Sequence, residues 1–434
     1  MIQKLKAAKI LSGTVALPGD KSISHRYAML AAIAEGESVI RHFAASQDCH
    51  STLKCLSALG VEFEAAGDVV TIQGRGLRGL RAPEKPLDAE NSGTTIRLLS
   101  GILAGQDFAC SITGDASLSN RPMGRILQPL RLMGAGVESR ERDLPPLVIR
   151  GGSLKGIRYS LPVASAQVKS CVLLAGLYAT GMTAVEESLP TRDHTEIALR
   201  EFGAEVRVSG GWIEIDPEPR LRAQRLTVPG DLSGAAFFLA AAAMVPDSDL
   251  TIPGVSLNGR RRELLNYLER AGMEISVENE TVANGEARGD LRARYSPAFL
   301  KRKMPDIKGA ETAALIDEIP ALAALGSQTA GGLEISDAGE LRIKESDRIS
   351  ATAENLRAMG AEVEEKPDGL IISGGRKLRG ADILTRKDHR IAMAFAVAGL
   401  AAEGETRIHD AECVNVSFPD FWNTLKTIAR QAVI

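Results

Sequence analysis

The sequence has few aromatic residues and almost no net charge. Phenylalanine, tryptophan and tyrosine make up 4% of the 434 residues, so alanine and the aliphatic side chains must build most of the core. There are 52 Lys and Arg against 55 Asp and Glu, a formal net charge of −3. This balance argues against a nucleic-acid-binding protein that works by bulk positive charge, but it leaves room for a local basic pocket.

Cysteine is also scarce, and its spacing carries no metal or redox signature. None of the five cysteines belongs to a CxxC pair or lies near histidine at zinc-ligand spacing. We therefore expect buried, reduced thiols and no zinc site. The five are Cys49, Cys55, Cys110, Cys171 and Cys413.

Long hydrophobic runs are missing as well. The longest, 235–245 and 391–402, fall short of the roughly 20 residues that span a bilayer. The first residues lack the continuous apolar core of a signal peptide. We expect these runs to form buried helices in a soluble cytoplasmic protein with no membrane partner.

One pattern recurs six times. Each copy has a polar start and an Ala/Leu-rich helix, followed by a short strand. In the first five copies a second helix ends at a glycine typical of a left-handed cap, whereas the sixth copy reaches the C-terminus first. Six copies in 434 residues predict two α/β domains of three βαβαββ units each. We expect the first helix of each unit to be buried and the second to be amphipathic. The polar starts are 20–22, 91–93, 165–167, 231–233, 317–319 and 388–390, and the glycines are Gly60, Gly134, Gly203, Gly272 and Gly360.

A formal dinucleotide fingerprint, Gly74-x-Gly76-x-x-Gly79, occurs in the first unit. That motif requires a helix directly after it, whereas Pro83 and Pro86 follow here. Similar turns recur in two other units, so the glycines are interpreted as structural.

The polar starts of the buried helices are candidate anion sites, because a helix N-terminus offers free N–H groups and partial positive charge. Lys21 lies where a cation opposes the helix dipole, so a bound anion explains it better than capping does. Arg26 follows Ser22 by four residues and should share its helical face, an arrangement that suits a carboxylate. By the same spacing, Lys344 and Arg348 are expected to share a face.

Eight motifs, in this order, resemble the 5-enolpyruvylshikimate-3-phosphate synthase family: LPGDKSISHR, NSGTTIRLL, GDASLSNRPM, ASAQVKS, TRDHTE, DEIPALAA, LRIKESDR and DHRIAM. The resemblance implies an α/β fold of two inside-out domains, each of three βαβαββ repeats. One domain would comprise residues 1–18 and 230–434, and the other residues 19–229.

The resemblance also implies an activity. The enolpyruvyl group of phosphoenolpyruvate would move to the 5-hydroxyl of shikimate-3-phosphate by addition and elimination, in chorismate biosynthesis. The family uses no metal or organic cofactor, and its domains close around the two small-molecule substrates. Glyphosate is the expected inhibitor, because tolerant members carry Ala where this chain has Gly93. We expect a monomer with no nucleic-acid partner.

Site residues follow from the same motifs. Shikimate-3-phosphate would contact Lys21, Ser22, Arg26, Ser165, Gln167, Arg192, Asp317 and Lys344. Phosphoenolpyruvate would contact Lys21, Gly93, Arg121, Gln167, Arg348 and Arg390. The catalytic residues would be Asp317, Glu345, Lys21 and His389. Asp317 would take the proton of the 5-hydroxyl, and either Glu345 or Lys21 would protonate C3. His389 would assist proton movement or only cap a helix.

Two alternatives stay open. The sister enolpyruvyl transferase that acts on UDP-N-acetylglucosamine has a reactive cysteine five residues before an Arg-Pro, whereas Ala116 stands there in this chain. A catalytically inactive anion-binding homologue is the other, although Asp317, Glu345 and Lys21 are all present. Val416 replaces a lysine found in some relatives, which leaves one phosphoenolpyruvate contact unassigned.

Overall fold

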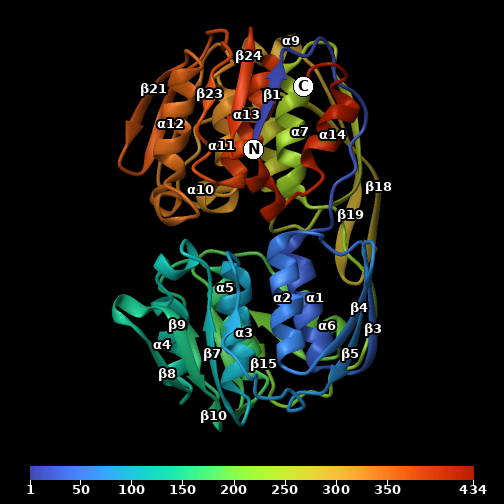
Figure 1. The fold of residues 1–434 in the computed structure, drawn as a ribbon, viewed down its shortest axis with the longest axis vertical. Coiled ribbons are helices and arrows are strands. Elements are labelled where there is room, and N and C mark those ends of the chain that lie inside the picture. Colours follow the sequence, from blue (N-terminus) through green and yellow to red (C-terminus); the bar gives the residue numbers. More distant parts are fainter. The chain divides into compact units, whose positions relative to one another are not determined.

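The computed structural model describes residues 1–434 as two compact units (Figure 1). Unit 1 comprises Met1–Pro18, Pro229–Val282 and Ala287–Ile434, and unit 2 comprises Gly19–Val228 and Ala283–Glu286. The chain therefore leaves unit 1 after its first two strands and returns to it some 210 residues later, at Pro229. None of the helices combines the length and the apolar character needed to cross a bilayer.

Unit 2 contains three four-stranded sheets with the same order and strand directions. In each, the first two strands of the order are parallel and the other neighbours are antiparallel. The orders are β16 (Arg225–Thr227), β3 (Glu35–Arg41), β5 (Val69–Arg75), β4 (Glu62–Ala66); then β6 (Leu87–Asp88), β7 (Ala109–Thr113), β9 (Leu144–Arg150), β8 (Gly136–Arg140); then β11 (Arg158–Ser160), β13 (Thr183–Glu186), β15 (Trp212–Ile215), β14 (Val206–Ser209). The short strands β10 (Leu154–Lys155) and β12 (Ala179–Thr180) form a separate pair.

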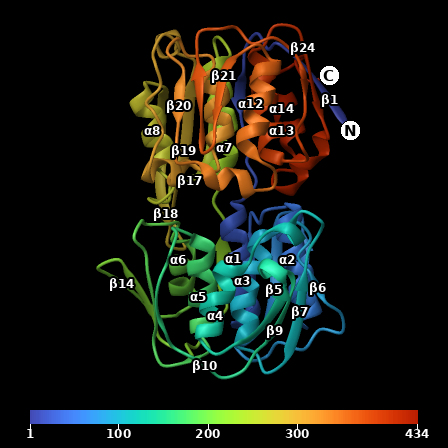
Figure 2. The same cartoon turned by 90° about the vertical axis from the view of Figure 1, so that its left-hand side faces the viewer.

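Each sheet of unit 2 accompanies two helices. The first helices are α1 (Lys21–Ile33), α3 (Gly93–Ala104) and α5 (Ala166–Gly176), and the second are α2 (Gln47–Ala58), α4 (Gly124–Leu132) and α6 (His194–Glu201). Single 3-10 turns lie at η1 (Leu118–Asn120) and η2 (Glu141–Asp143). The turned view in Figure 2 shows α1, α3 and α5 in the interior of the unit.

Unit 1 has a related plan of one four-stranded and two three-stranded sheets, and its first two strands complete two of them. The sheets are β18 (Glu274–Ala283), β19 (Glu286–Arg294), β17 (Asp249–Ser256), β2 (Ser12–Thr14); then β20 (Leu333–Ile335), β22 (Gly369–Ser373), β21 (Glu362–Lys366); then β1 (Ile2–Lys6), β24 (Glu405–His409), β23 (Asp382–Ile383). The helices are α7 (Leu232–Met244), α8 (Glu263–Ala271), α9 (Pro297–Leu300), α10 (Ala310–Leu315), α11 (Ile319–Gly326), α12 (Arg348–Ala358), α13 (His389–Ala401) and α14 (Phe421–Ile428), with 3-10 turns η3 (Gly339–Ile343) and η4 (Ala411–Val416).

Cap chemistry sets the helix boundaries, and it confirms the predicted repeat. All six polar starts contain the N-cap of a first helix: Asp20, Ser92, Ser165, Asp231, Glu318 and Asp388. The side chains of all but Glu318 accept a hydrogen bond from the first turn, which satisfies an otherwise unpaired N–H group. The five predicted stop glycines, Gly60, Gly134, Gly203, Gly272 and Gly360, have φ of 85°, 99°, 99°, 90° and 88°. A side chain would strain the backbone there.

Two separate hydrophobic cores form around the first helices, one in each unit. Every residue of α7 and of α11 is buried, as predicted for the first helices. The predicted α/β class with three βαβαββ units per domain is thereby confirmed. The Gly74–Gly79 segment begins in the last two residues of β5 and leads into a stretch without a helix, so it does not have the structure of a dinucleotide site. All five cysteines are buried free thiols.

Candidate functional site

Lys21 is the first residue of α1, so its ammonium lies at the positive end of a helix dipole. Asp48, on α2, offsets that repulsion: its Oδ2 lies 2.8 Å from Lys21 Nζ. The Lys21 side chain is 18% exposed and that of Asp48 is 9% exposed. Lys21 is therefore held in place and still accessible, as an anion ligand must be.

Arg26 is almost fully buried one turn further along α1. Its Nη1 donates to the Ser22 carbonyl at 2.8 Å, and its Nη2 donates to Ser170 Oγ on α5 at 2.9 Å. Its Nε donates to Thr195 Oγ1 on α6 at 2.7 Å. Three helices thus fix the guanidinium, and its fork keeps further N–H donors on Nη1 and Nη2 for a ligand.

The charge on Arg26 is costly in this setting. Burial lowers the pKa of its guanidinium to about 10; the carboxylate of Glu196 opposes this shift, and the nearby Arg192 adds to it. Arg192 lies on the loop between β13 and α6, just before that helix. Two guanidinium groups close enough to repel each other form a site that favours an anion.

The start of α3 forms a second cationic group. Gly93 is its first residue, and a Cβ there would lie 2.6 Å from Arg97 Nη1 and 3.6 Å from Arg121 Nη1. Arg97 Nη1 also donates to Gln167 Oε1 on α5 at 2.9 Å, and Arg121 Nη2 donates to Asn91 Oδ1 at 3.1 Å. The glycine therefore brings the backbone of a helix N-terminus against two guanidinium groups.

The start of α5 adjoins this group. Ser165 caps the helix by accepting a hydrogen bond from Val168 N at 3.3 Å, and Gln167 Nε2 donates to Thr94 Oγ1 at 3.0 Å. Unit 2 thus gathers the predicted residues of 19–229 at the N-terminal ends of α1, α3, α5 and α6.

Arg348 is the centre of the predicted residues in unit 1. Its side chain is 1% exposed, and its Nε lies 2.8 Å from Asp388 Oδ2. Its Nη2 donates to Glu345 Oε2 at 2.5 Å, and its Nη1 lies 3.6 Å from Asp317 Oδ1. Burial would lower the pKa of Arg348, but these three carboxylates together raise it above its usual value. The guanidinium is therefore permanently charged.

Asp317 lies between two guanidinium groups, in the turn that precedes α11. In addition to Arg348, Arg390 approaches it: Nη2 lies 3.7 Å from Asp317 Oδ2, and Nη1 donates to the Asp317 carbonyl at 2.7 Å. His389, the first residue of α13, is buried beside Arg390. A carboxylate at a helix start between two cations is well placed to accept a proton from a bound hydroxyl.

The expected common face for Lys344 and Arg348 is wrong. Lys344 follows the 3-10 turn η3 with an extended backbone, whereas Arg348 is the first residue of α12. The reason is Asp347, whose side chain accepts from Ser350 N at 3.0 Å and starts the helix after Lys344. The four-residue spacing spans this helix boundary, so helical geometry does not apply to it.

Three residues of these groups were not predicted from the sequence as site residues. Asp48 holds Lys21, Arg97 bridges Gly93 and Gln167, and Asp388 holds Arg348. Asp388 did carry a signal as the start of a buried helix. Asp48 carried none, because Lys21 lies 27 residues away in sequence. The four-residue spacing from Gly93 could have indicated Arg97, whereas its other partner, Gln167, lies 70 residues away.

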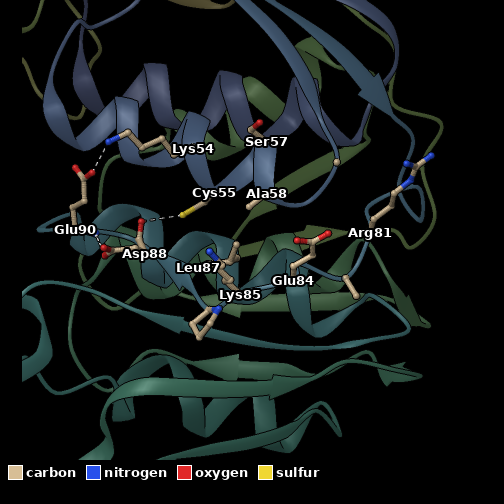
Figure 3. A pocket seen from close by; sticks show the side chains of 13 residues that line it. Lys54, Cys55, Ser57, Ala58, Arg81, Glu84, Lys85, Leu87, Asp88 and Glu90 are labelled. Atoms are coloured by element: carbon tan, nitrogen blue, oxygen red, sulfur yellow. Dashed lines mark hydrogen bonds and ion pairs between the residues drawn. The ribbon is translucent and has the colours of Figure 1, made fainter.

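A cavity of 680 Å³ in unit 2 contains none of the predicted residues (Figure 3). It lies between the end of α2 and the segment 81–90. Its lining carries basic and acidic side chains in equal number, and Lys54 Nζ lies 2.7 Å from Glu90 Oε1. This mixed lining lacks the concentrated positive charge of the helix starts, which are therefore the better candidate for an anion site.

Comparison with known proteins decides the family. Residues 5–425 match the family EPSP synthase (3-phosphoshikimate 1-carboxyvinyltransferase). The chain belongs to the EPSP synthase family. A 3-phosphoshikimate 1-carboxyvinyltransferase of Solibacter usitatus is 52% identical over 430 residues, covering 99% of this chain and 100% of the relative. One of Salinibacter ruber is 50% identical over 435 residues, covering 99% of this chain and all of that protein.

Solved structures agree with this assignment. EPSP synthase from Acinetobacter baumannii superimposes with a TM-score of 0.88 at 42% identity and covers 100% of this chain and 99% of its own. The enolpyruvyl transferase NikO from Streptomyces tendae has a TM-score of 0.77 at 18% identity, covering 98% of this chain and 97% of its own, which shows a shared fold only. The resemblance drawn from the eight motifs is thereby confirmed.

Proposed function

We propose that this chain transfers the enolpyruvyl group of phosphoenolpyruvate to the 5-hydroxyl of shikimate-3-phosphate and releases phosphate. Membership of the EPSP synthase family supports the reaction. The observation that carries the chemistry is Asp317, whose carboxylate lies 3.6 Å from Arg348 and 3.7 Å from Arg390. The carboxylate can take the proton of the attacking hydroxyl, and the two guanidinium groups can balance the negative charge of the enol phosphate.

Shikimate-3-phosphate is assigned mainly to unit 2. Arg26 and Ser22 bind its carboxylate, because the remaining donors of the buried guanidinium form a fork that fits two oxygens. Ser165 and Arg192 bind its phosphate, and Gln167 lines the ring. Asp317 and Lys344 of unit 1 contact the reacting side of the same molecule.

Phosphoenolpyruvate is assigned to Lys21, the backbone of Gly93, Arg121, Gln167, Arg348 and Arg390. Two guanidinium groups bind the negatively charged groups of phosphoenolpyruvate. Asp388 holds that of Arg348, and the Asp317 carbonyl holds that of Arg390. Asp317 takes the proton of the 5-hydroxyl as oxygen attacks C2, while Glu345 or Lys21 protonates C3. The adduct then loses phosphate from C2 and a proton from the C3 methyl group, which forms the enol ether of shikimate-3-phosphate, and His389 is assigned to assist this proton movement.

Glyphosate is proposed to inhibit this chain, which keeps the small residue Gly93 at the start of α3. We also propose a monomer that works in the cytoplasm. The cytoplasmic assignment is supported by five free, buried thiols, since reduced cysteines persist in reducing compartments.

A phosphate-release assay tests the reaction. Purified protein should release phosphate from phosphoenolpyruvate only when shikimate-3-phosphate is present, and not with shikimate alone. Release that depends on UDP-N-acetylglucosamine would favour the sister reaction. The buried cysteines argue against that result: burial raises the pKa of Cys110, the nearest in sequence to Arg121, to about 12, so it is a poor nucleophile. Binding of both anions without phosphate release would identify an inactive homologue.

A further inference from the structure

Lys169 is a fully buried lysine on α5 that no step of the proposed reaction uses. Its side chain has no exposed surface, and it lies on a helix whose residues from Val168 to Gly176 are all buried. A buried ammonium is costly unless it is paired. Its Nζ lies 2.6 Å from Glu196 Oε1 on α6 and 3.1 Å from Glu187 Oε2, directly after β13. The lysine therefore joins α5, α6 and the loop between β13 and α6.

Glu187 also forms hydrogen bonds within the loop between β13 and α6. Its other oxygen, Oε1, accepts from Thr191 N at 3.2 Å and from the Thr191 hydroxyl. The carboxylate is 8% exposed, so these contacts are little weakened by water. Thr191 directly precedes Arg192. One carboxylate thus ties the buried lysine to the residue directly before Arg192.

Glu196 connects the same lysine to the helix that holds Arg26 through a hydrogen bond. Burial raises the pKa of Glu196, and Lys169 is the main opposing influence. The residue before it, Thr195, accepts the hydrogen bond from Arg26 Nε, and its hydroxyl also pairs with Ser170 on α5. Lys169 therefore supports both arginines assigned to shikimate-3-phosphate and faces neither directly.

We propose that Lys169 is a positioning residue of the shikimate-3-phosphate subsite, acting through Glu187 and Thr191 on Arg192. The inference rests on the proposed function, because that function assigns Arg192 to the phosphate of this substrate. The contacts from Lys169 through Glu187 to Thr191 should affect one substrate only, because the loop 187–192 carries no residue assigned to phosphoenolpyruvate. Loosening them weakens the binding of shikimate-3-phosphate and spares that of phosphoenolpyruvate.

The first test is Lys169→Met, which removes the charge and keeps a long apolar side chain. Calorimetric titration with shikimate-3-phosphate should give a dissociation constant about 10- to 100-fold higher, because small displacements of a binding group cost that much. The KM for phosphoenolpyruvate should stay nearly unchanged, because none of the residues assigned to it lies on the loop 187–192. Val172→Ala is the matched control: it lies on the same helix, is fully buried, and should lower Tm with neither constant changed.

The second test does not unpair a buried charge. Thr191→Val removes only the hydroxyl that donates to Glu187, and should raise the dissociation constant about 2- to 12-fold, the worth of one hydrogen bond. Thr191→Ser restores the hydroxyl and should restore affinity, which a purely structural role would not explain. Suppose that the wild type turns over, and that Thr191→Val and a folded Lys169→Met both bind shikimate-3-phosphate as tightly as the wild type does. That result would overturn the inference and leave the proposed function standing. A wild-type protein without turnover would overturn the proposed function and the inference together.

Discussion

Arg348 and Asp388 form a buried ion pair within unit 1, with Arg348 Nε 2.8 Å from Asp388 Oδ2 and side-chain exposures of 1% and 0%. Burial would raise the pKa of Asp388, but the adjacent Arg348 holds it below its usual value. The same carboxylate accepts from Arg390 N at 2.9 Å and so caps α13. Asp388 thereby fixes two arginines assigned to phosphoenolpyruvate.

Asp388→Asn should lower the free energy of unfolding by about 3–5 kcal/mol at neutral pH, since it leaves a buried guanidinium without its main partner. The effect should depend on pH. The folded pKa of Asp388 lies below its unfolded value of about 3.9. Its stabilisation is therefore complete above about pH 4 and is lost as pH falls through the folded pKa.

Thermal melts of both proteins between pH 7 and pH 3 check this prediction. The gap in Tm should be constant from pH 7 to about pH 4 and should begin to shrink as the pH falls below 4. Asp382→Asn serves as the control, because Asp382 pairs with His409 at 2.9 Å but is 55% exposed, and surface pairs contribute little. A gap for Asp388→Asn that stays constant over the whole range would contradict the account.

Lys21→Met should abolish turnover and weaken binding of phosphoenolpyruvate while the protein stays folded. The removed cation is assigned to the substrate, and such groups contribute on the order of 10²–10³ in rate. A small loss of Tm is expected, because Asp48 loses its partner. Lys54→Met is the matched control: it breaks the pair with Glu90, which is 2.7 Å long but lies on the surface, and should leave steady-state kinetics unchanged.

Asp317→Ala should lower kcat far more than it weakens the binding of shikimate-3-phosphate. A positioned acid or base contributes on the order of 10²–10⁴ in rate. Kinetics and calorimetric titration on the same preparation separate the two effects. Equal losses would mean that Asp317 only balances the charge of Arg348 and Arg390.

Gly93→Ala should raise the inhibition constant of glyphosate much more than the KM for phosphoenolpyruvate. Gly93 does not have positive φ, so an alanine adds no backbone strain. Its methyl group would instead lie 2.6 Å from Arg97 Nη1, and the guanidinium bonded to Gln167 must shift. Paired inhibition series at fixed shikimate-3-phosphate measure both constants. If the wild type already tolerates millimolar glyphosate, Gly93 does not control access.

The sequence predicts features that depend on neighbouring residues. The capping side chains and the glycines after the second helices could be located because they act within one helical turn. The partners of Arg26 could not: Ser170 and Thr195 lie 144 and 169 residues away and meet it only when α1, α5 and α6 pack. The error at Lys344 has the same origin, since a spacing rule was applied across the start of a helix.

The most direct test of the account is the reaction itself, followed by NMR in deuterated water with phosphoenolpyruvate and shikimate-3-phosphate. Phosphorus spectra should show equal amounts of inorganic phosphate and a new phosphorylated product. Proton spectra should show a vinyl group on that product that contains deuterium, because C3 is protonated during addition and loses a proton during elimination. Phosphate released without a new vinyl ether, or no reaction at all, would contradict the account.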